Sequence, residues 1–255
     1  MTIIHEITVL PGINKQGERE EFIPIIIRPG DCLSIVGPTG SGKTAFINDI
    51  EVFAQGDTAT KRIVLVNGEV PDEMLVRDPA QKPIAMITQN TKCFADLTVN
   101  DFLIMHIKAR GLSDASIVDR VISVANGFTG EYVTPEMRVT SLSGGQTRAL
   151  LISDALVIGN KPIILLDEIE NAGIFKEKVI SCLKNNKRAV IFVTHDPYVA
   201  LLSERRIVMK NGAVTKVIEP GPSEEAALFE IRRMDECLHS LRERIRSGEQ
   251  ILGIA

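Results

Sequence analysis

One stretch of eight residues restricts the fold of this chain more than any other feature. Residues 37–44 read Gly-Pro-Thr-Gly-Ser-Gly-Lys-Thr and fit the pattern GxxxxGK[ST]. The apolar run CLSIV precedes them, and a segment compatible with a helix, AFINDIEVFA, follows. A glycine-rich turn between a strand and a helix directs successive backbone N–H groups at phosphate oxygens. The pattern therefore predicts a phosphate-binding loop, called the phosphate loop below.

Each residue of the phosphate loop has an expected role. Lys43 would neutralise the β- and γ-phosphates of a nucleotide, and the Thr44 hydroxyl would ligate Mg²⁺. At average composition such a match arises by chance in about 1% of chains of this length, so a plain glycine-rich turn is a weak alternative. The predicted nucleotide-binding residues of the loop are Gly37, Pro38, Thr39, Gly40, Ser41, Gly42, Lys43 and Thr44.

Short β-branched runs recur along the chain and alternate with helical stretches. Continuous apolar runs such as IILL and VIFV indicate strands that are buried on both faces, as in a parallel sheet covered by helices. The stretch from about 98 to 125 is helical in character, with Ser113 as a candidate N-cap, and it interrupts the strands like an inserted subdomain. We expect strands at residues 3–9, 22–27, 32–36, 62–66, 83–88, 162–166, 189–193, 206–209 and 213–218.

Composition excludes several classes of protein. The 255 residues carry 29 Lys+Arg against 33 Asp+Glu, a net charge of −4, which argues against an extended basic surface for nucleic acid and leaves only a local basic groove open. The first residues include Glu6 and no basic region, so they do not predict a signal peptide. The longest apolar runs are about five residues, whereas a membrane span needs about twenty. We therefore expect a cytoplasmic protein.

The segment after residue 222 has a different pattern. Its apolar residues are spaced alternately by four and three positions, an a/d pattern over nearly three heptads. A helix packed on its own domain and a helix that docks a partner both produce such a stripe, so both interpretations stay open. We expect a main domain at residues 1–222 and a C-terminal helix within 223–255 as a candidate interaction segment. The stripe consists of Ala227, Ile231, Met234, Leu238, Leu241 and Ile245.

A second motif identifies the kind of phosphate-loop protein. Residues 142–146 read Leu-Ser-Gly-Gly-Gln and precede the apolar segment TRALLISDALV. By composition this motif would arise by chance in on the order of 0.03% of such chains. With both motifs in this order, the sequence resembles the ATP-binding cassette (ABC) ATPase family, whose signature motif is LSGGQ. The resemblance covers about residues 20–220.

The remaining motifs of the family follow in the expected order. Gln89 stands at the position of the Q-loop, where the resemblance implies a metal ligand that takes part in catalysis. Asp167 and Glu168 end the run PIILLDE and resemble the Walker B motif with its catalytic glutamate, and His195 in VIFVTHD resembles the switch histidine. Independently of the family, a carboxylate at a strand end can hold Mg²⁺, and its neighbour can polarise an attacking water. A histidine at such an end can contact a γ-phosphate.

The resemblance implies an α/β fold of the P-loop NTPase type. It has a mainly parallel sheet, an N-terminal antiparallel β region and an inserted helical subdomain at about residues 90–150 that carries the signature motif. It also implies a head-to-tail dimer with a second ABC subunit, an identical chain in the simplest case, with ATP and Mg²⁺ between the two chains. The phosphate loop of one chain would face Ser143, Gly144, Gly145 and Gln146 of the other.

Two functions of such an ATPase fit the sequence. The first is the ATP-binding subunit of a membrane transporter, with permease partners at the cytoplasmic face of the membrane. The segment FADLTVNDF at 94–102 favours it, because this segment resembles one found in many transporter cassettes. A soluble ATPase that remodels a protein such as a metalloenzyme, or a nucleic-acid complex, is favoured by the heptad-like tail. It is also favoured by residues 169–174, which lack the family's usual Pro-Thr-Ser-Ala-Leu-Asp stretch. A kinase would share the phosphate loop but leaves LSGGQ unexplained.

An expected aromatic residue is missing. Family members usually stack the adenine on an aromatic side chain well upstream of the phosphate loop. Between His5 and Lys43 the only aromatic residue is Phe22, which is better explained as part of a strand core. The sequence therefore predicts no strong selectivity for ATP over GTP from stacking at this position. Asp154 is a further departure, because arginine is common at this place in the signature helix.

Overall fold

A central six-stranded sheet organises the molecule. The computed structural model describes residues 3–88, 91, 95–114, 116–168 and 173–250. Neighbouring strands run parallel except for the last pair, which is antiparallel. In spatial order the strands are β5 (Ile84–Ile87), β6 (Ile163–Asp167), β7 (Ala189–Val193), β3 (Cys32–Val36), β8 (Arg205–Lys210) and β9 (Ala213–Ile218). The predicted mainly parallel sheet is confirmed.

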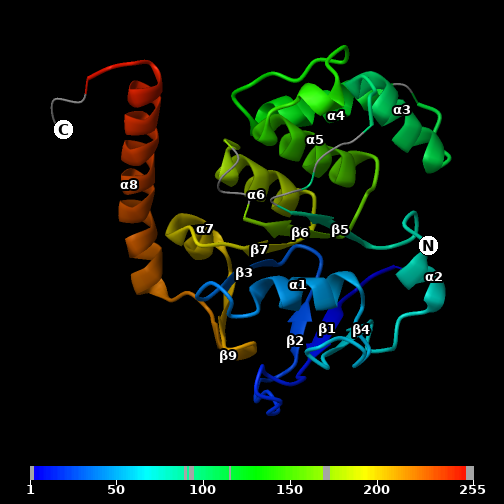
Figure 1. The fold of residues 1–255 in the computed structure, drawn as a ribbon, viewed down its shortest axis with the longest axis vertical. Helices are drawn as coiled ribbons and strands as arrows, with labels where there is room; N and C mark the ends of the chain where they lie inside the picture. The colour runs from blue at the N-terminus through cyan, green and yellow to red at the C-terminus, as the bar shows by residue number, and fades with distance from the viewer. Residues whose placement is uncertain (1–2, 89–90, 92–94, 115, 169–172, 251–255) are drawn as a thin grey trace.

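Both faces of this sheet are covered (Figure 1). Successive residues of β6 alternate between two apolar clusters: Ile163 and Leu165 join one, and Ile164 and Leu166 join the other. The first cluster includes α1 (Lys43–Glu51), and the second includes α5 (Gly144–Val157) and α6 (Lys176–Asn185) on the opposite face. This explains why the central strands are apolar at most positions rather than at every second one.

A smaller antiparallel sheet completes the first face. Strand β1 (Ile7–Leu10) lies between β2 (Ile25–Ile27) and β4 (Ile63–Val66) and pairs with both in antiparallel register. Its buried residues join the same cluster as α1. Phe22 packs against this cluster too, as expected of a core residue. The predicted N-terminal antiparallel β region is therefore confirmed, and α1 is held between two sheets.

The inserted helices form a layer of their own. Helices α3 (Val99–Ala109) and α4 (Ser116–Phe128), a 3₁₀ turn at Val139–Ser141 and one side of α5 share a third apolar cluster. The same helix α5 also packs on the sheet, so the expected boundary near residue 150 falls within a continuous helix. Ser113 is not the residue that caps α4, because the Asp114 carboxylate accepts the N–H of Ser116 at 2.9 Å. A short helix, α2 (Glu73–Arg77), precedes β5.

The C-terminal helix α8 (Pro222–Arg246) follows β9 and stands beside α7 (Pro197–Leu202) at one side of the domain (Figure 1). Along its predicted stripe, Met234, Leu238 and Ile245 remain 63%, 52% and 62% exposed. The single chain therefore leaves much of the stripe uncovered. No helix in the described ranges is both long and apolar enough to cross a membrane. Three ion pairs join α8 to the domain: Arg206–Glu224, Lys176–Asp235 and Glu177–Arg232.

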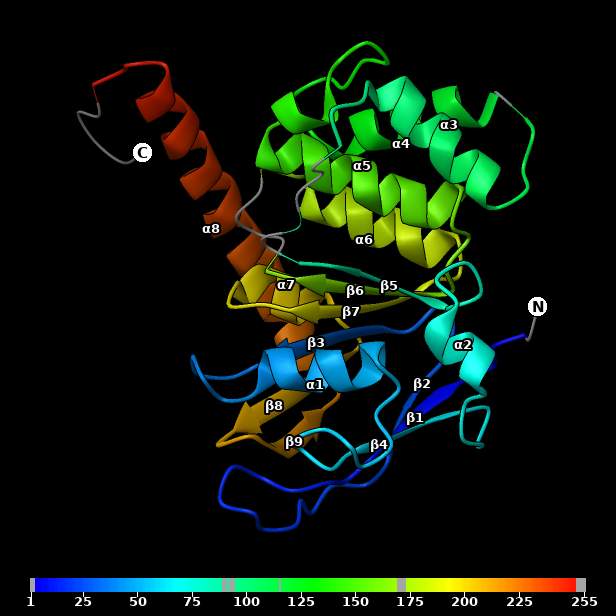
Figure 2. The same ribbon diagram turned by 45° about the vertical axis from the view of Figure 1, so that its right-hand side comes forward.

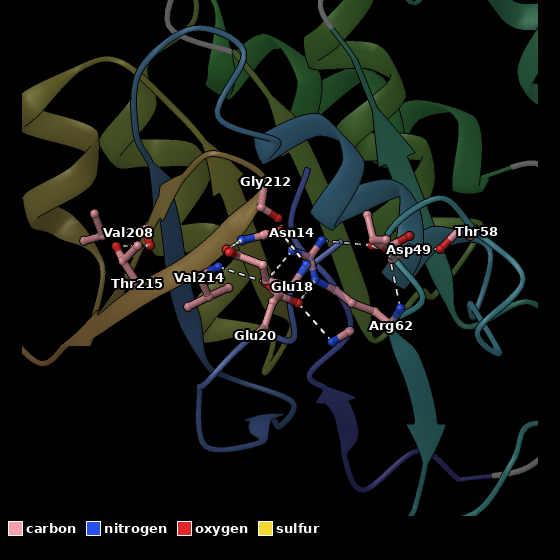
Figure 3. Close-up of polar contacts among 12 residues, drawn as sticks. Asn14, Glu18, Glu20, Asp49, Thr58, Arg62, Val208, Gly212, Val214 and Thr215 are labelled. Atoms are coloured by element: carbon pink, nitrogen blue, oxygen red, sulfur yellow. Dashed lines mark hydrogen bonds and ion pairs between the residues drawn. The ribbon is translucent and has the colours of Figure 1, made fainter. Parts of the chain in front are cut away.

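A buried ionic cluster lies under the phosphate loop (Figure 3). The Arg62 guanidinium is fully buried and donates two hydrogen bonds to the Glu20 carboxylate, at 2.7 and 2.8 Å. It also donates to Asp49 of α1 at 3.0 Å and to the Gly212 carbonyl at 2.7 Å, and it lies 5.0 Å from the centre of the Phe46 ring. One side chain thus connects α1, the N-terminal loop and the β8–β9 turn.

We predict that Arg62→Ala destabilises the fold by about 3–5 kcal/mol, because two buried carboxylates would lose their counter-charge. The measurement is the free energy of unfolding by urea denaturation. Arg77→Ala is the control, since its ion pair with Glu73 is 78% and 72% exposed and should contribute less than about 1 kcal/mol. Equal effects of the two substitutions would contradict a structural role for the cluster.

Candidate functional site

The phosphate loop has the geometry that its glycines predict. It leaves β3 at Val36 and enters α1 at Lys43, and Gly37 and Gly42 have φ angles of 151° and 100°. A Cβ atom on Gly37 would lie 2.3 Å from the Met209 carbonyl oxygen of β8. Glycine at this position is therefore required by the neighbouring strand as well as by the backbone conformation. The loop is fixed against the sheet before any ligand arrives.

Lys43 places a positive charge inside the loop. Its side chain bends over the loop, and its Nζ donates to the carbonyls of Gly37 at 2.9 Å and Pro38 at 3.2 Å. Burial lowers the pKa of Lys43, and the nearby carboxylates of Glu168 and Asp167 partly offset this. An anion bound in the loop would favour the charged form further and raise the pKa. The loop thus has the donors and the charge for phosphate groups.

The predicted acidic residues and histidine lie at one edge of the sheet. Asp167 ends β6, and its neighbour across the ladder is Val193, the last residue of β7. The Glu168 N–H donates to the Val193 carbonyl at 2.9 Å, and His195 follows β7 two residues later. The His195 Nε2 lies 3.5 Å from the Glu168 Oε1. The structure therefore brings Asp167, Glu168 and His195 together, with Lys43 close enough to respond to both carboxylates.

Glu168 has an unusual backbone. Its φ angle is 49°, in the left-handed region that a residue with a side chain seldom adopts. Such a conformation costs on the order of 1–3 kcal/mol and is concentrated at active sites. The surrounding structure therefore holds Glu168 in a conformation that few residues with a side chain adopt.

The donor set at this edge fits a magnesium ion. Thr44 offers a hydroxyl in the first turn of α1 and Asp167 a carboxylate at the end of β6, and Mg²⁺ prefers such hard oxygen ligands. No cluster of three or more His, Cys, Asp or Glu side chains that could hold a metal occurs in the described residues. Gln89, the third predicted metal ligand, lies outside the described residues.

The signature motif opens helix α5. Ser143 is its N-cap: the Ser143 Oγ accepts the Gln146 N–H at 3.2 Å, and the Ser143 N–H donates to the Gln146 Oε1 at 2.9 Å. This capping box holds Gly144 and Gly145 in the first turn, where helix N–H groups have no partner within the helix and attract anions. The motif therefore presents helix N–H groups of the kind that bind anions.

The two anion sites belong to different layers of the molecule. Figure 2 shows α1 below the central sheet and α5 above it. The partners of Ser143 are Gln146 and the Glu131 carboxylate, which accepts from the Ser143 Oγ at 2.6 Å. The structure thus brings the phosphate loop together with Asp167, Glu168 and His195, while the signature motif forms a separate site.

Three contacts at these sites were not predicted from the sequence. Lys15, in the loop after β1, donates from its Nζ to the Gly40 carbonyl at 2.7 Å. Glu131 and Tyr132 lie against the signature motif, where the Gln146 Nε2 donates to the Tyr132 carbonyl at 2.9 Å. All three residues come from irregular segments without periodicity, so only their closeness to a motif in the fold reveals them.

Comparison with known proteins agrees with this geometry. The sequence profile described as ABC transporter matches residues 23–171. The chain is 47% identical to the ABC transporter ATP-binding protein MJ0121 of Methanocaldococcus jannaschii, over 97% of this chain and 95% of that protein. The chain belongs to the ABC transporter family. It is an ABC-type ATPase that binds ATP.

Other members of the ABC family are more distant. The chain is 29% identical to the thiamine import ATP-binding protein ThiQ of Brucella suis, over 82% of this chain and 85% of that protein. One solved structure that resembles this fold is the ATP-binding cassette MJ0796, a dimer in a post-hydrolysis state with ADP and phosphate. Its TM-score is 0.63 and its sequence identity 26%, over 84% of this chain and 99% of that chain. The ADP conformation of the cassette MJ1267 has a TM-score of 0.62 at 20% identity, over 90% of this chain and 99% of that one, and supports the fold.

We predict that Gly37→Ala abolishes high-affinity ATP binding, because its methyl group would collide with the backbone of Met209. Gly40→Ala is the matched control: its Cβ would meet nothing within 4 Å, and only its φ of 75° opposes the substitution. The measurement is the Kd for a fluorescent ATP analogue at equilibrium. Binding by Gly37→Ala as tight as by Gly40→Ala would disprove the steric requirement.

Proposed function

We propose that this ABC ATPase binds ATP with Mg²⁺ between two copies arranged head to tail, and that hydrolysis drives a conformational change in membrane permease subunits at the cytoplasmic face. The observation that supports catalysis best is the convergence of Lys43, Asp167, Glu168 and His195 at one edge of the sheet. Open α/β sheets bind their ligands at this edge.

Each residue at this edge has a distinct proposed role. Lys43 and the N–H groups of the phosphate loop hold the phosphates, and Glu168 polarises the attacking water as general base. His195 contacts the γ-phosphate, and its position 3.5 Å from Glu168 supports a shared task. Thr44, Asp167 and Gln89 hold Mg²⁺, which would neutralise charge on the phosphates.

The signature motif supports the head-to-tail arrangement. Ser143, Gly144, Gly145 and Gln146 form an anion site that is separate from the phosphate loop of the same chain, although nucleotide phosphates are the expected anions of both. A second copy related by a two-fold axis would bring each signature motif to the other chain's phosphate loop and create two equal sites. The dimeric state of the related cassette MJ0796 is in line with this arrangement.

The names of the relatives support a transporter. ThiQ is named as a thiamine import ATP-binding protein, and a PotA protein of Photobacterium profundum, 30% identical over 80% of this chain and 56% of that protein, as a spermidine/putrescine import ATP-binding protein. We infer a permease partner for this chain from these relatives and from the segment at 94–102 that resembles transporter cassettes.

We predict that Glu168→Gln binds ATP normally but loses hydrolysis by about 10²–10⁴-fold, because the amide cannot accept the proton of the attacking water. With ATP and Mg²⁺ the variant should accumulate as a dimer on gel filtration. Glu177→Gln is the control, since it removes the same charge from the ion pair with Arg232 on the surface. Hydrolysis at the parent rate by Glu168→Gln would remove Glu168 from the role of general base.

The exposed stripe on α8 favours the alternative of a remodelling ATPase. Met234, Leu238 and Ile245 are more than half exposed, and Arg242 and Arg244 flank the C-terminal part of the stripe. The occupant that fits is an amphipathic helix of a partner protein, with acidic residues beside its apolar face. In this alternative, residues 223–255 bind the macromolecule on which the ATPase acts.

Copurification in mild detergent separates the two functions. The transporter proposal predicts that the intact chain brings down a multi-span membrane protein, and that the double substitution Met234→Glu and Leu238→Glu leaves this partner bound. The alternative predicts a soluble partner that the double substitution releases, with ATP hydrolysis unchanged. Ser240→Glu, an exposed position outside the stripe, is the control. A preparation of the intact chain with no membrane partner would count against the transporter proposal.

A further inference from the structure

Three aromatic side chains of the described residues are exposed: Tyr132, Phe229 and Phe175. The sequence contains nine Phe, two Tyr and no Trp. One tyrosine, Tyr198, is buried, whereas Tyr132 is 76% exposed, more than any other aromatic side chain among the described residues. Tyrosine is enriched among the residues that carry most of the binding energy at interfaces.

The backbone around Tyr132 is fixed. Its carbonyl accepts from the Gln146 Nε2 at 2.9 Å, and the same Gln146 side chain closes the capping box with Ser143. The next residue, Val133, is 1% exposed, and both its N–H and its carbonyl bond to the Asn126 side chain, at 2.7 and 3.0 Å. The ring is therefore presented to solvent from a rigid position beside the signature motif rather than from a loose loop.

The aromatic side chains closest in sequence to the phosphate loop are not exposed in this way. Phe46 and Phe53, which belong to α1 and the residues just after it, are 0% and 1% exposed, and Phe22 packs against the core. The exposed group beside the loop is Lys15, which bonds to Gly40. Among the described residues, the rings closest in sequence to the phosphate loop therefore pack into the core of their own chain. Adenine has a flat aromatic face and gains free energy when a ring stacks on it.

We propose that Tyr132 of one subunit stacks on the base of the nucleotide that the phosphate loop of the other subunit holds. This inference rests on the head-to-tail dimer of the proposed function. The signature motif meets the phosphate chain of that nucleotide through Ser143, and the hydrogen bond from Gln146 keeps Tyr132 next to it. The aromatic contact that the sequence lacks near its own phosphate loop is then supplied by the partner.

A stacked ring in the partner has a consequence for recognition. Stacking accepts every base because each has a π-face, so Tyr132 contributes affinity and dimer closure rather than selectivity between ATP and GTP. A chain without the dimer would bind the phosphates alone. The base would therefore strengthen binding only when two chains close around it.

The first test measures dimer formation in the Glu168→Gln background, where ATP is retained. Adding Tyr132→Ala should raise the ATP concentration for half-maximal dimerisation by about 5- to 100-fold, the loss expected for one stacked base. Adding Tyr132→Phe should leave it within about twofold, because phenylalanine keeps the ring. Adding Thr134→Ala, an exposed position in the same segment, is the control. Sedimentation velocity with ATP and Mg²⁺ gives the dimer fraction.

The second test distinguishes stacking in the partner from stacking in the same chain. The test mixes two variants, Lys43→Ala and Tyr132→Ala. Each variant alone should hydrolyse ATP slowly when the ATP concentration is limiting. The mixed dimer contains one site of two with both Lys43 and the partner's tyrosine intact. Half of the dimers are mixed after equal chains assort at random, so hydrolysis should recover to about a quarter of the parent level. If Tyr132 acted within its own chain, no site would be intact and no recovery would occur.

The outcomes are distinct. Unchanged dimerisation by Tyr132→Ala would overturn the stacking proposal and leave the head-to-tail dimer standing. Dimerisation that weakens equally with Tyr132→Phe would overturn it too, because the hydroxyl rather than the ring would then be responsible. A parent Glu168→Gln protein that stays monomeric with ATP would disprove the dimer itself and the stacking with it.

Discussion

The buried ion pair of Arg62 with Glu20 and Asp49 is the interaction on which the arrangement of the site depends. Arg62 is anchored at the start of β4, Asp49 lies on the helix that follows the phosphate loop, and Gly212 accepts from Arg62 through its carbonyl. The Gly212 N–H in turn donates to the carbonyl of Ser41 in the loop itself, at 2.9 Å. Both carboxylates accept hydrogen bonds from the guanidinium, so the cost of burying them is offset by short, charge-assisted bonds. The cluster thereby connects the phosphate loop and α1 to the β8–β9 turn.

On that fixed support, the site combines one buried cation with two carboxylates and a histidine at neighbouring strand ends. Burial lowers the pKa of Lys43 while Glu168 and Asp167 raise it, so the charge of the lysine depends on groups that would also face a bound phosphate. Glu168 adopts a left-handed backbone conformation beside Asp167. This conformation is unfavourable by itself, so interactions in the surrounding structure must stabilise it. The signature motif is equally prepared, since a capping box presents its N–H groups, but it lies in the helical layer.

Sequence patterns predicted the regular parts of this fold. The strands at 32–36, 189–193 and 213–218 have the predicted bounds, because apolar runs between turn residues define them locally. The phosphate loop was predictable for the same reason. The Arg62 cluster was not, since Arg62 lies 42 residues from Glu20 and looks like an ordinary strand residue. Tyr132 was equally hidden, because its importance arises from a contact with Gln146 that only the fold creates. The heptad-like pattern predicted helix α8, but it did not indicate which of the apolar residues along the helix remain exposed.

In the proposed dimer, one nucleotide is held by two chains. A crystal structure of the Glu168→Gln protein with ATP and Mg²⁺ would show whether this is so. We expect a two-fold dimer with two ATP molecules, each contacted by Lys43 of one chain and by Ser143 of the other. ATP bound by Lys43 with no second chain over it, or with Ser143 of neither chain against its phosphates, would disprove the arrangement.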